Sequence, residues 1–223
     1  EFSNRTDDII TGIIQRIEQK NVYVDLGKAE AVLPVSEQIP TETYVMGQRI
    51  KCYVVEVRKT TKGAQILLSR THPGLLRRLF ELEVPEIYDG VVELKSVARE
   101  PGRRSKIAVY SRDENVDSVG ACVGPKGTRV QNIVTELQNE KIDIVKWDED
   151  PAVYIANALS PAQVISVTVD EANKTSGVVV PDYQLSLAIG KAGQNARLAA
   201  KLTNWKIDIK SESQAGEALP AAA

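Results

Sequence analysis

The chain has 223 residues, a formal net charge of −2 and a sequence pI near 5.7, so it lacks the overall basic excess of many nucleic-acid binders. This length suits two or three small domains, while two cysteines and one histidine are too few for a disulfide framework or a zinc site. No apolar run is long enough to span a bilayer and residues 1–20 lack a signal-peptide pattern, so we expect a cytoplasmic protein without membrane association and with Cys52 and Cys122 reduced.

Residues 9–70 contain five short runs that are rich in β-branched or alternating apolar residues. Glycines and polar breaks separate these runs, and no strong helical period occurs among them. Five strands in such a short segment are typical of a small closed barrel of the OB type. We assign this barrel to residues 1–71.

The hydrophobic period changes to that of a helix after the barrel. Pro73 suits the first position of a helix, with Thr71 or His72 as its cap, and the helix ends at Pro85 or at residues 88–90. Strands follow at 91–99 and 105–111, then a short helix from Asp117, a longer one from Thr128 and a strand at 141–147. We assign residues 72–158 to this second domain.

The same order of elements returns in the remainder of the chain. A helix capped by Asp150 and Pro151 precedes strands at 164–169 and 175–180, helices at 181–189 and 194–202, and a strand at 205–210. The string "KIDI" occurs in the last strand of both copies, at 141–144 and 206–209. We assign residues 159–211 to a third domain and expect a disordered tail at 212–223.

Each copy contains a glycine-bracketed loop between two helices, "CVGPKGTRV" at 122–130 and "AIGKAGQNA" at 188–196. A helix–GxxG–helix segment followed by a strand, in a unit opened by a helix and two strands, is the arrangement of a KH domain with the prokaryotic element order. The predicted fold class is therefore multidomain: a small OB-type β-barrel followed by two α+β KH domains, with helices packed on a three-stranded sheet.

The two loops are the predicted RNA-binding sites. Glycines without Cβ atoms let the main chain approach a sugar-phosphate backbone, and the helix N-terminus that follows suits phosphate. Lysines in the loops and arginines beyond them add positive charge. The candidate residues are Val123, Gly124, Pro125, Lys126, Gly127, Thr128 and Arg129 in the first unit, and Ile189, Gly190, Lys191, Ala192, Gly193, Gln194, Asn195 and Arg197 in the second.

Bases would lie in an apolar groove beside each loop. Val123 and Ile189 are candidates for its floor, and Gln194 and Asn195 are candidates for reading Watson–Crick edges. Positive charge is concentrated in two segments, because residues 91–112 and 186–210 each carry a net charge of +4, whereas residues 140–151 carry −3. This distribution favours a localised binding site for a polyanion. Arg103 and Arg104, in the turn of the first basic segment, are possible auxiliary contacts, although a solvated hairpin explains them equally well.

Of two alternatives to RNA binding for the loops themselves, one remains. The glycines could simply end one helix before the next begins, although two similar copies make this less persuasive. A phosphate-binding loop of the GxxxxGK[ST] type does not fit, because the glycine and lysine spacings are wrong in both copies. With a single histidine and no evident catalytic pair, we expect neither an enzyme nor a cofactor.

The segments "DSVGACVGPKGTRVQNIVTELQNEKIDIVKWDEDP" and "PDYQLSLAIGKAGQNARLAAKLTNWKIDIKSE" resemble the two KH units of the NusA family of bacterial transcription factors. The preceding barrel is similar to the family's S1-type domain, and the resemblance covers residues from about 5 to 211. It implies a monomeric core that binds single-stranded nascent RNA and affects pausing, termination and antitermination, with RNA polymerase and antitermination factors as partners. It also implies that the family's N-terminal polymerase-binding domain would precede residue 1.

Two departures from the family's pattern affect the expected contacts. Of the aromatic positions usual on an S1-type RNA face, only Tyr23 is aromatic here, while Lys20 and Pro34 occupy two others. Tyr23 could equally be a packed strand residue. Ala192 stands where a second basic loop residue is common. An alternative function is therefore docking of polymerase or other factors, through the acidic segment 148–150 or the barrel, with RNA binding secondary.

Overall fold

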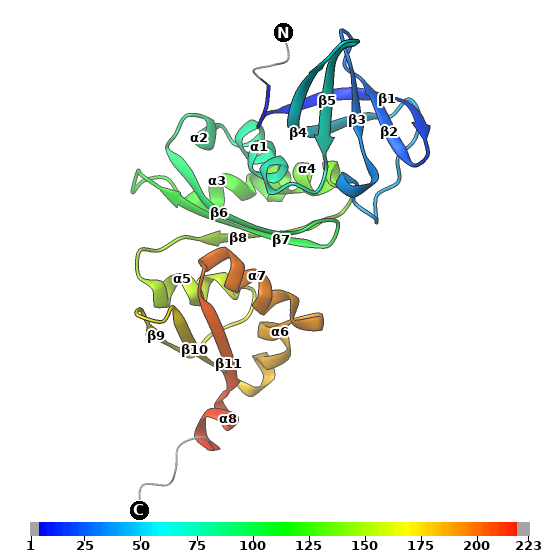
Figure 1. Ribbon diagram of the computed structural model, residues 1–223. Helices are drawn as coiled ribbons and strands as arrows, with labels where there is room; N and C mark the ends of the chain where they lie inside the picture. Colours follow the sequence, from blue (N-terminus) through cyan, green and yellow to red (C-terminus); the bar gives the residue numbers. More distant parts are fainter. Residues whose placement is uncertain (1–4, 218–223) are drawn as a thin grey trace, which may run out of the picture.

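The computed structural model describes residues 5–217, whose secondary-structure elements follow one another along an elongated molecule (Figure 1). The N-terminal strands form one end, a three-stranded sheet crosses the middle, and a second three-stranded sheet lies toward the other end. The order of units in space is therefore the order along the sequence.

The N-terminal unit is a closed barrel with the strand order β1-β2-β3-β5-β4, as predicted. Neighbouring strands are antiparallel except β3 and β5, which run parallel. Alternate side chains such as Ile14, Val24 and Leu68 fill the interior, because successive strand residues face opposite sides. The strands are β1 (Ile9–Glu18), β2 (Asn21–Asp25), β3 (Glu30–Leu33), β4 (Arg49–Thr60) and β5 (Gly63–Ser69), with a 3-10 turn at Val35–Glu37.

Helix α1 (Pro73–Glu83) follows the barrel and is capped as predicted. The His72 Nδ1 atom accepts a hydrogen bond from the Gly74 N–H at 2.9 Å, and Pro73 occupies the first helical position, where no N–H is needed. The predicted apolar face is buried: Leu75, Leu76, Leu79 and Phe80. A short helix, α2 (Pro85–Tyr88), comes next.

The first α/β unit has the sheet order β6-β7-β8, with β7 antiparallel to β6 and parallel to β8. Helices α1, α3 and α4 cover one face of this sheet (Figure 1), and Phe80, Ile107 and Ile133 lie in the core between them. The elements are β6 (Val92–Glu100), β7 (Arg104–Ser111), α3 (Ser118–Val123), a 3-10 turn (Pro125–Gly127), α4 (Thr128–Glu136) and β8 (Lys141–Lys146).

The second α/β unit repeats this pairing in a sheet of order β11-β10-β9. Strand β10 is antiparallel to β9 and parallel to β11, so the predicted internal repeat is confirmed at the level of topology. The elements are α5 (Pro151–Ala158), β9 (Ser166–Asp170), β10 (Thr175–Val180), α6 (Leu185–Ile189), α7 (Gln194–Thr203) and β11 (Lys206–Ser211), with 3-10 turns at Asp182–Gln184 and Lys191–Gly193.

A shared apolar core joins the two α/β units. Ala98, Ala108 and Val145 of the first sheet belong to the same buried cluster as side chains of α5 and α7. This cluster removes apolar surface of both units from water, which stabilises their contact. The packing supports the prediction that the two units move as one body.

One buried arginine joins the barrel to the first α/β unit. Arg70, at the end of the barrel, is 1% exposed and pairs with Glu42 of the barrel. Its guanidinium also reaches α4, where Nη2 donates to the Glu136 carbonyl at 2.9 Å and Nη1 lies 3.2 Å from the Glu136 carboxylate. Because removing one partner would leave a buried charge, this contact fixes the barrel against α4.

The turn between β6 and β7 is held from within its own unit. The fully buried Glu140 carboxylate accepts hydrogen bonds from the Arg99 guanidinium, the Gly102 N–H at 2.7 Å and the Ser105 hydroxyl at 2.9 Å. Gly102 has a φ of +78°, and the side chain of Thr41 in the barrel occupies the space that a Cβ atom would need. The turn is therefore fixed by Glu140 of its own unit and packs closely against the barrel.

The predicted disordered tail at 212–223 is wrong for its first part. Residues Glu212–Glu217 form helix α8, and the Ser213 hydroxyl donates to the Asp182 carboxylate at 2.5 Å. This contact with the segment before α6 could not be inferred from a sequence without an apolar period. Residues 218–223, and residues 1–4 of the predicted barrel, lie outside the described residues.

The domain boundaries at 71 and 158 stay predictions. Tyr154, Ile155 and Ala158 of α5 lie in one buried cluster with Val178 and other side chains of the second α/β unit. That packing favours a boundary before Pro151 rather than after residue 158. Between residues 5 and 217, no helix is long and apolar enough to cross a membrane.

Candidate nucleic-acid interface

The two glycine-bracketed loops have almost the same backbone conformation. Gly124 and Gly190 have φ/ψ of 76°/172° and 80°/168°, and each ends a helix, α3 or α6. The third loop residues, Lys126 and Ala192, both have φ/ψ of 55°/27°. Two loops of different sequence thus adopt one shape, which identifies them as equivalent structural elements.

The first glycine of each loop is required by packing as well as by its φ. A Cβ atom on Gly124 would lie 2.6 Å from Cγ of Arg129, and one on Gly190 would lie 2.7 Å from the backbone nitrogen of Asn195. At Gly127, the fourth position, nothing lies within 4 Å of the Cβ position, so only its φ of +73° favours glycine. The first glycine of each loop therefore does end a helix, whereas the surface beside Gly127 is open to a ligand backbone.

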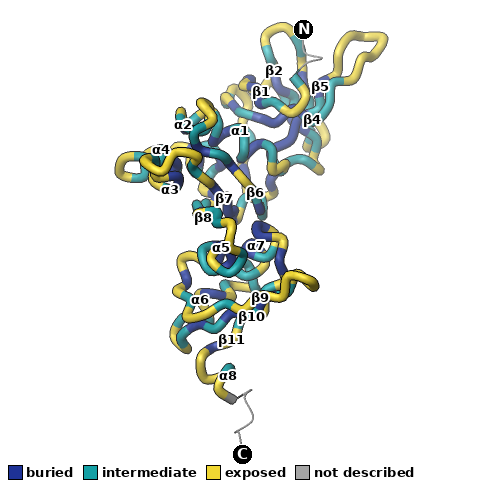
Figure 2. The backbone as a smooth tube through the Cα atoms, turned by 90° about the vertical axis from the view of Figure 1, so that its left-hand side faces the viewer, coloured by how far each residue is buried: buried dark blue, intermediate teal, exposed yellow. Residues whose placement is uncertain are grey.

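Each loop presents one exposed lysine, but at different positions. Pro125, Lys126, Lys191 and Ala192 are all exposed, and Figure 2 shows the loop between α3 and α4 as an exposed projection. The equal φ/ψ angles align Lys126 with Ala192 and Pro125 with Lys191. A phosphate would therefore meet the lysine at the third position of the first loop but at the second position of the second loop.

Arg129 and Arg197 hold the loops in place. Nη1 of Arg129 donates to the Ala121 carbonyl at 2.6 Å and to the Glu86 carboxylate at 2.8 Å. Nη1 of Arg197 donates to the Ala192 carbonyl at 3.0 Å. Both arginines were predicted to contact RNA. The structure shows internal partners for both, so their first role is to position the loops.

The second loop is tied to the first α/β unit through Glu100, at the end of β6. The Glu100 carboxylate accepts from Nε of Arg197 at 2.6 Å and from Nε2 of Gln194 at 3.0 Å. The hydrogen bond from Arg197 is the main cause that lowers the pKa of Glu100, which keeps this carboxylate ionised. Glu100 was not among the predicted site residues, since its partners are distant in sequence.

Asn195 does not fit its predicted role as a base reader. Its side chain is fully buried, and Nδ2 donates to the Leu159 carbonyl at 3.1 Å and to the Ala188 carbonyl at 2.8 Å. Asn195 therefore connects α7 to the ends of α5 and α6. Gln194 is half-buried and its amide is bonded to Glu100, so its access to a base is limited.

The predicted groove floor is more open in the second unit than in the first. Ile189 is 37% exposed and Leu187 is 44% exposed, whereas Val123 is half-buried. Thr128, at the start of α4, is exposed beside the first loop. Apolar surface for a base is thus available next to the second loop.

The auxiliary candidates differ in access. Arg103 is exposed, but Arg104 is only 8% exposed and its guanidinium pairs with Asp143 at 2.6 Å, so a contact of Arg104 with RNA does not fit the structure. The Tyr23 ring is half-buried and lies under the Arg16 guanidinium at 4.2 Å. One face of the Tyr23 ring is therefore already occupied, which limits its use as a stacking platform.

The sequence matches three families in succession: "S1 RNA binding domain" over residues 3–69, "NusA-like first KH domain" over residues 70–147 and "NusA-like second KH domain" over residues 151–217. The predicted fold class, an OB-type barrel followed by two KH domains, is thereby confirmed. The match to the second KH family begins at residue 151, in agreement with the packing of α5.

Similar proteins carry one name, transcription termination/antitermination protein NusA. The relative in Halalkalibacterium halodurans is 69% identical over 217 residues, with 97% of this chain and 57% of the relative covered. The relative in Bacillus subtilis is 67% identical, with 97% and 58% covered, and the one in Thermus thermophilus is 51% identical, with 100% and 58% covered. The chain thus spans a little over half the length of these curated relatives.

Proposed function

The chain belongs to the NusA family, and we propose that it binds single-stranded nascent RNA and thereby affects pausing, termination and antitermination by RNA polymerase. The observation that carries this proposal is the pair of loops with equal backbone shape, both presented on one packed body. In each loop the glycines, the exposed lysine and the following helix N-terminus suit a sugar-phosphate backbone.

A single RNA strand would cross both loops in extended form. The shared core of the two KH units and the Glu100–Arg197 contact hold the loops at a fixed separation. A second contact made by the same RNA is then intramolecular, which raises the overall affinity. Binding through phosphates should weaken with salt, with a slope near −0.7 per neutralised phosphate.

The remaining expectations follow the family. We propose that the protein acts as a cytoplasmic monomer, by binding rather than catalysis, without a cofactor, and that RNA polymerase and antitermination factors are its partners. The relatives' names support a place in transcription termination and antitermination.

The test is fluorescence anisotropy of labelled single-stranded RNA with a loop variant carrying Pro125→Asp, Lys126→Asp, Lys191→Asp and Ala192→Asp. Asp tolerates the positive φ at positions 126 and 192, so the loops should keep their shape. A control with the same charge change places aspartate at four exposed positions away from the loops: Lys146, Ser166, Ala172 and Lys210. Circular dichroism checks that both variants fold.

The proposal predicts that the loop variant loses at least tenfold in affinity while the control variant loses much less. Equal losses in the two variants would show that only net charge matters and would overturn the assignment to the loops.

Protein docking is the second candidate function. A cleft of about 720 Å³ at the end of the first KH unit is lined by Tyr110 and Trp147 and by the carboxylates of Asp113, Glu114, Asp117, Asp148 and Glu149. This acidic lining favours a basic partner. Binding of such a partner should survive in the loop variant, whereas RNA binding should not.

A further inference from the structure

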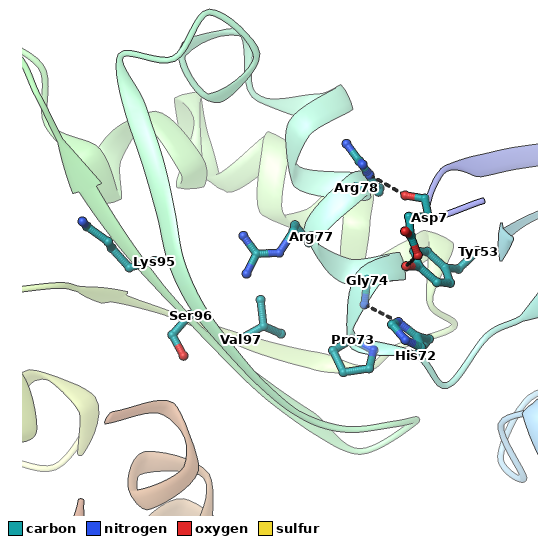
Figure 3. A pocket seen from close by; sticks show the side chains of 10 residues that line it. All are labelled: Asp7, Tyr53, His72, Pro73, Gly74, Arg77, Arg78, Lys95, Ser96 and Val97. Atoms are coloured by element: carbon teal, nitrogen blue, oxygen red, sulfur yellow. Dashed lines mark hydrogen bonds between the residues drawn. The ribbon is translucent and has the colours of Figure 1, made fainter. Parts of the chain in front are cut away.

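A second cleft lies between the barrel, α1 and β6, and it has a volume of about 460 Å³ (Figure 3). Its lining contains Asp7 and Tyr53 from the barrel side, His72, Arg77 and Arg78 around α1, and Lys95 from β6. Strand β6 is the edge of the first KH sheet opposite β8. None of the loop residues described above lines this cleft.

One wall of the cleft is a flat aromatic platform. The His72 imidazole stacks on the Tyr53 ring with centroids 4.2 Å apart and an angle of 8° between the planes. Both rings are held, because Nδ1 of His72 accepts the Gly74 N–H and the Tyr53 hydroxyl donates to Asp7 at 2.6 Å. Tyr53 is buried, whereas His72 is exposed and lines the cleft, so it can stack on a second flat ring.

Positive charge lies beside this platform. The Arg77 side chain projects into the cleft near Ser96 and Val97 (Figure 3), and Nη1, which carries two of the five N–H donors, donates to the Leu94 carbonyl at 3.0 Å. Its fork geometry suits a phosphate. Lys95 also lines the cleft, but its amine is engaged elsewhere: Nζ lies 3.5 Å from Glu93 and 4.6 Å from the centre of the Trp147 ring, and Figure 3 shows it turned away from His72.

Arg78 is committed to the protein itself. Its Nε donates to the Asp7 carbonyl at 2.8 Å and its Nη1 to the Glu81 carboxylate at 2.7 Å. Arg78 thereby joins α1 to the segment before β1 and helps to keep the cleft in shape. Among the described residues no carboxylate pairs with Arg77, so its guanidinium is the cation that remains for a ligand.

We propose that this cleft binds a nucleotide unit of single-stranded RNA, with a base stacked on His72 and the adjoining phosphate on Arg77. The ligand class rests on the proposed function, and the cleft adds a contact at the junction of the barrel and the first KH domain. A peptide of acidic residues alone would use the charge of Arg77 but has no aromatic ring for the platform, so the combination favours RNA.

His72 is the only histidine in the chain, so its imidazole protons give unambiguous NMR signals. The native chain and the four-site loop variant are each titrated at constant pH with an adenosine tetranucleotide, with inorganic phosphate and with a tetra-aspartate peptide. We expect the tetranucleotide alone to produce a saturable upfield shift of the His72 protons, in both proteins, because a stacked base adds a ring current. Arg77→Gln should weaken this binding by about tenfold, whereas Lys95→Gln removes a charge that is already paired with Glu93 and should weaken it much less.

The outcomes separate this proposal from the function proposed for the loops. If the tetranucleotide leaves the His72 signals unchanged while anisotropy finds RNA binding that depends on the loops, the cleft proposal is overturned and the loop proposal stands. If the His72 shift persists while RNA binding proves independent of the loops, the cleft proposal stands alone. A shift that vanishes in the loop variant, or one that phosphate or the acidic peptide reproduces, overturns the cleft proposal.

A second variant tests the platform directly. His72→Asn keeps an acceptor for the Gly74 N–H, so α1 should stay capped, but it removes the imidazole ring. His72→Asn is added to the four-site loop variant, and circular dichroism checks that the product folds. The proposal predicts that it binds the tetranucleotide at least fivefold more weakly than the loop variant alone. Unchanged binding overturns the stacking on His72.

Discussion

Gly190 and Gly193 lie in the same loop with nearly equal φ values, yet their surroundings constrain them differently. At Gly190 a Cβ atom would lie 2.7 Å from a backbone nitrogen, whereas at Gly193 the nearest atom would be 3.8 Å away, at the end of the Arg197 side chain. We predict that Gly193→Ala costs about 1–2 kcal/mol of unfolding free energy, from its φ alone, and that Gly190→Ala costs clearly more. Urea unfolding of the two variants checks this, and equal losses would contradict it.

Lys106 gives a prediction about pH. Its amine is fully buried at the contact of the two KH units, where Nζ lies 3.0 Å from the Asp143 carboxylate and 2.8 Å from the Ser160 carbonyl. Burial lowers the pKa of Lys106 to about 8, against the opposing attraction of Asp143. The ordinary value is 10.5, so between these two pH values the unfolded chain binds more protons than the folded one. The contribution of Lys106 to stability therefore rises with pH across this window.

The measurement compares the native chain with Lys106→Met, because other titrating groups affect both proteins alike. The unfolding free energy of the native chain, relative to the variant, should increase by about 1–3 kcal/mol as the pH rises from near 8 to near 10.5. A constant difference across that range would mean that the amine keeps an ordinary pKa in the folded protein.

Single residues are where inference from the sequence was weakest. The types and spacing in "GKAGQN" indicated an RNA-binding loop, but they did not reveal that Asn195 faces the interior. Likewise, Arg103 and Arg104 are adjacent in sequence, and only the pairing of Arg104 with Asp143 on the neighbouring strand separates their roles. Such partners are set by tertiary packing, which a local pattern does not contain.

At the scale of elements, the β6–β7 turn depends on one buried carboxylate. Glu140 is fully buried and binds Arg99, Gly102 and Ser105. Glu140→Ala leaves the Arg99 guanidinium buried without its counter-ion, so we predict a loss of about 3–5 kcal/mol in unfolding free energy. Glu18→Ala is the control, because its pair with Arg16 is exposed and should contribute less than about 1 kcal/mol. Similar losses in thermal unfolding for both variants would contradict this account.

Most elements could be predicted because their signals are local. Alternating apolar residues indicated the barrel strands, and proline with a capping residue marked the start of α1 and α5. Helix α8 is the exception, since its position depends on the contact of Ser213 with Asp182, far away in sequence. The placement of the boundary beside α5 also depends on packing, because its apolar residues alone do not indicate which sheet they cover; the buried cluster around α5 favours grouping it with the second KH domain.

At the scale of the molecule, the two KH domains are stacked, with the first sheet against the helices of the second unit. The first sheet presents Ala98, Ala108 and Val145 to these helices, whereas β11 of the second sheet carries exposed Lys206, Asp208 and Lys210. The two sheets thus differ in the face that they turn away from their own helices: that of the first is apolar and buried, and that of the second is charged and meets water.

The shared core should therefore control the relative placement of the loops. Ala108→Asp would put a carboxylate into the apolar contact, so we predict separation of the KH units, with a larger radius of gyration in small-angle X-ray scattering. Ala172→Asp, at an exposed turn, is the matched control and should leave the scattering unchanged. An unchanged radius of gyration for Ala108→Asp would mean that other contacts suffice to hold the pair.

The most direct test of the account measures affinity against RNA length, for the native chain and for variants of each loop alone. One variant carries Pro125→Asp and Lys126→Asp, and the other carries Lys191→Asp and Ala192→Asp. If one strand crosses both loops on a rigid body, the affinity of the native chain rises at least tenfold once the RNA is long enough to bridge them, and either variant abolishes that rise. A gradual increase with length that both variants retain would contradict the central claim, because the loops would then not act together on one RNA.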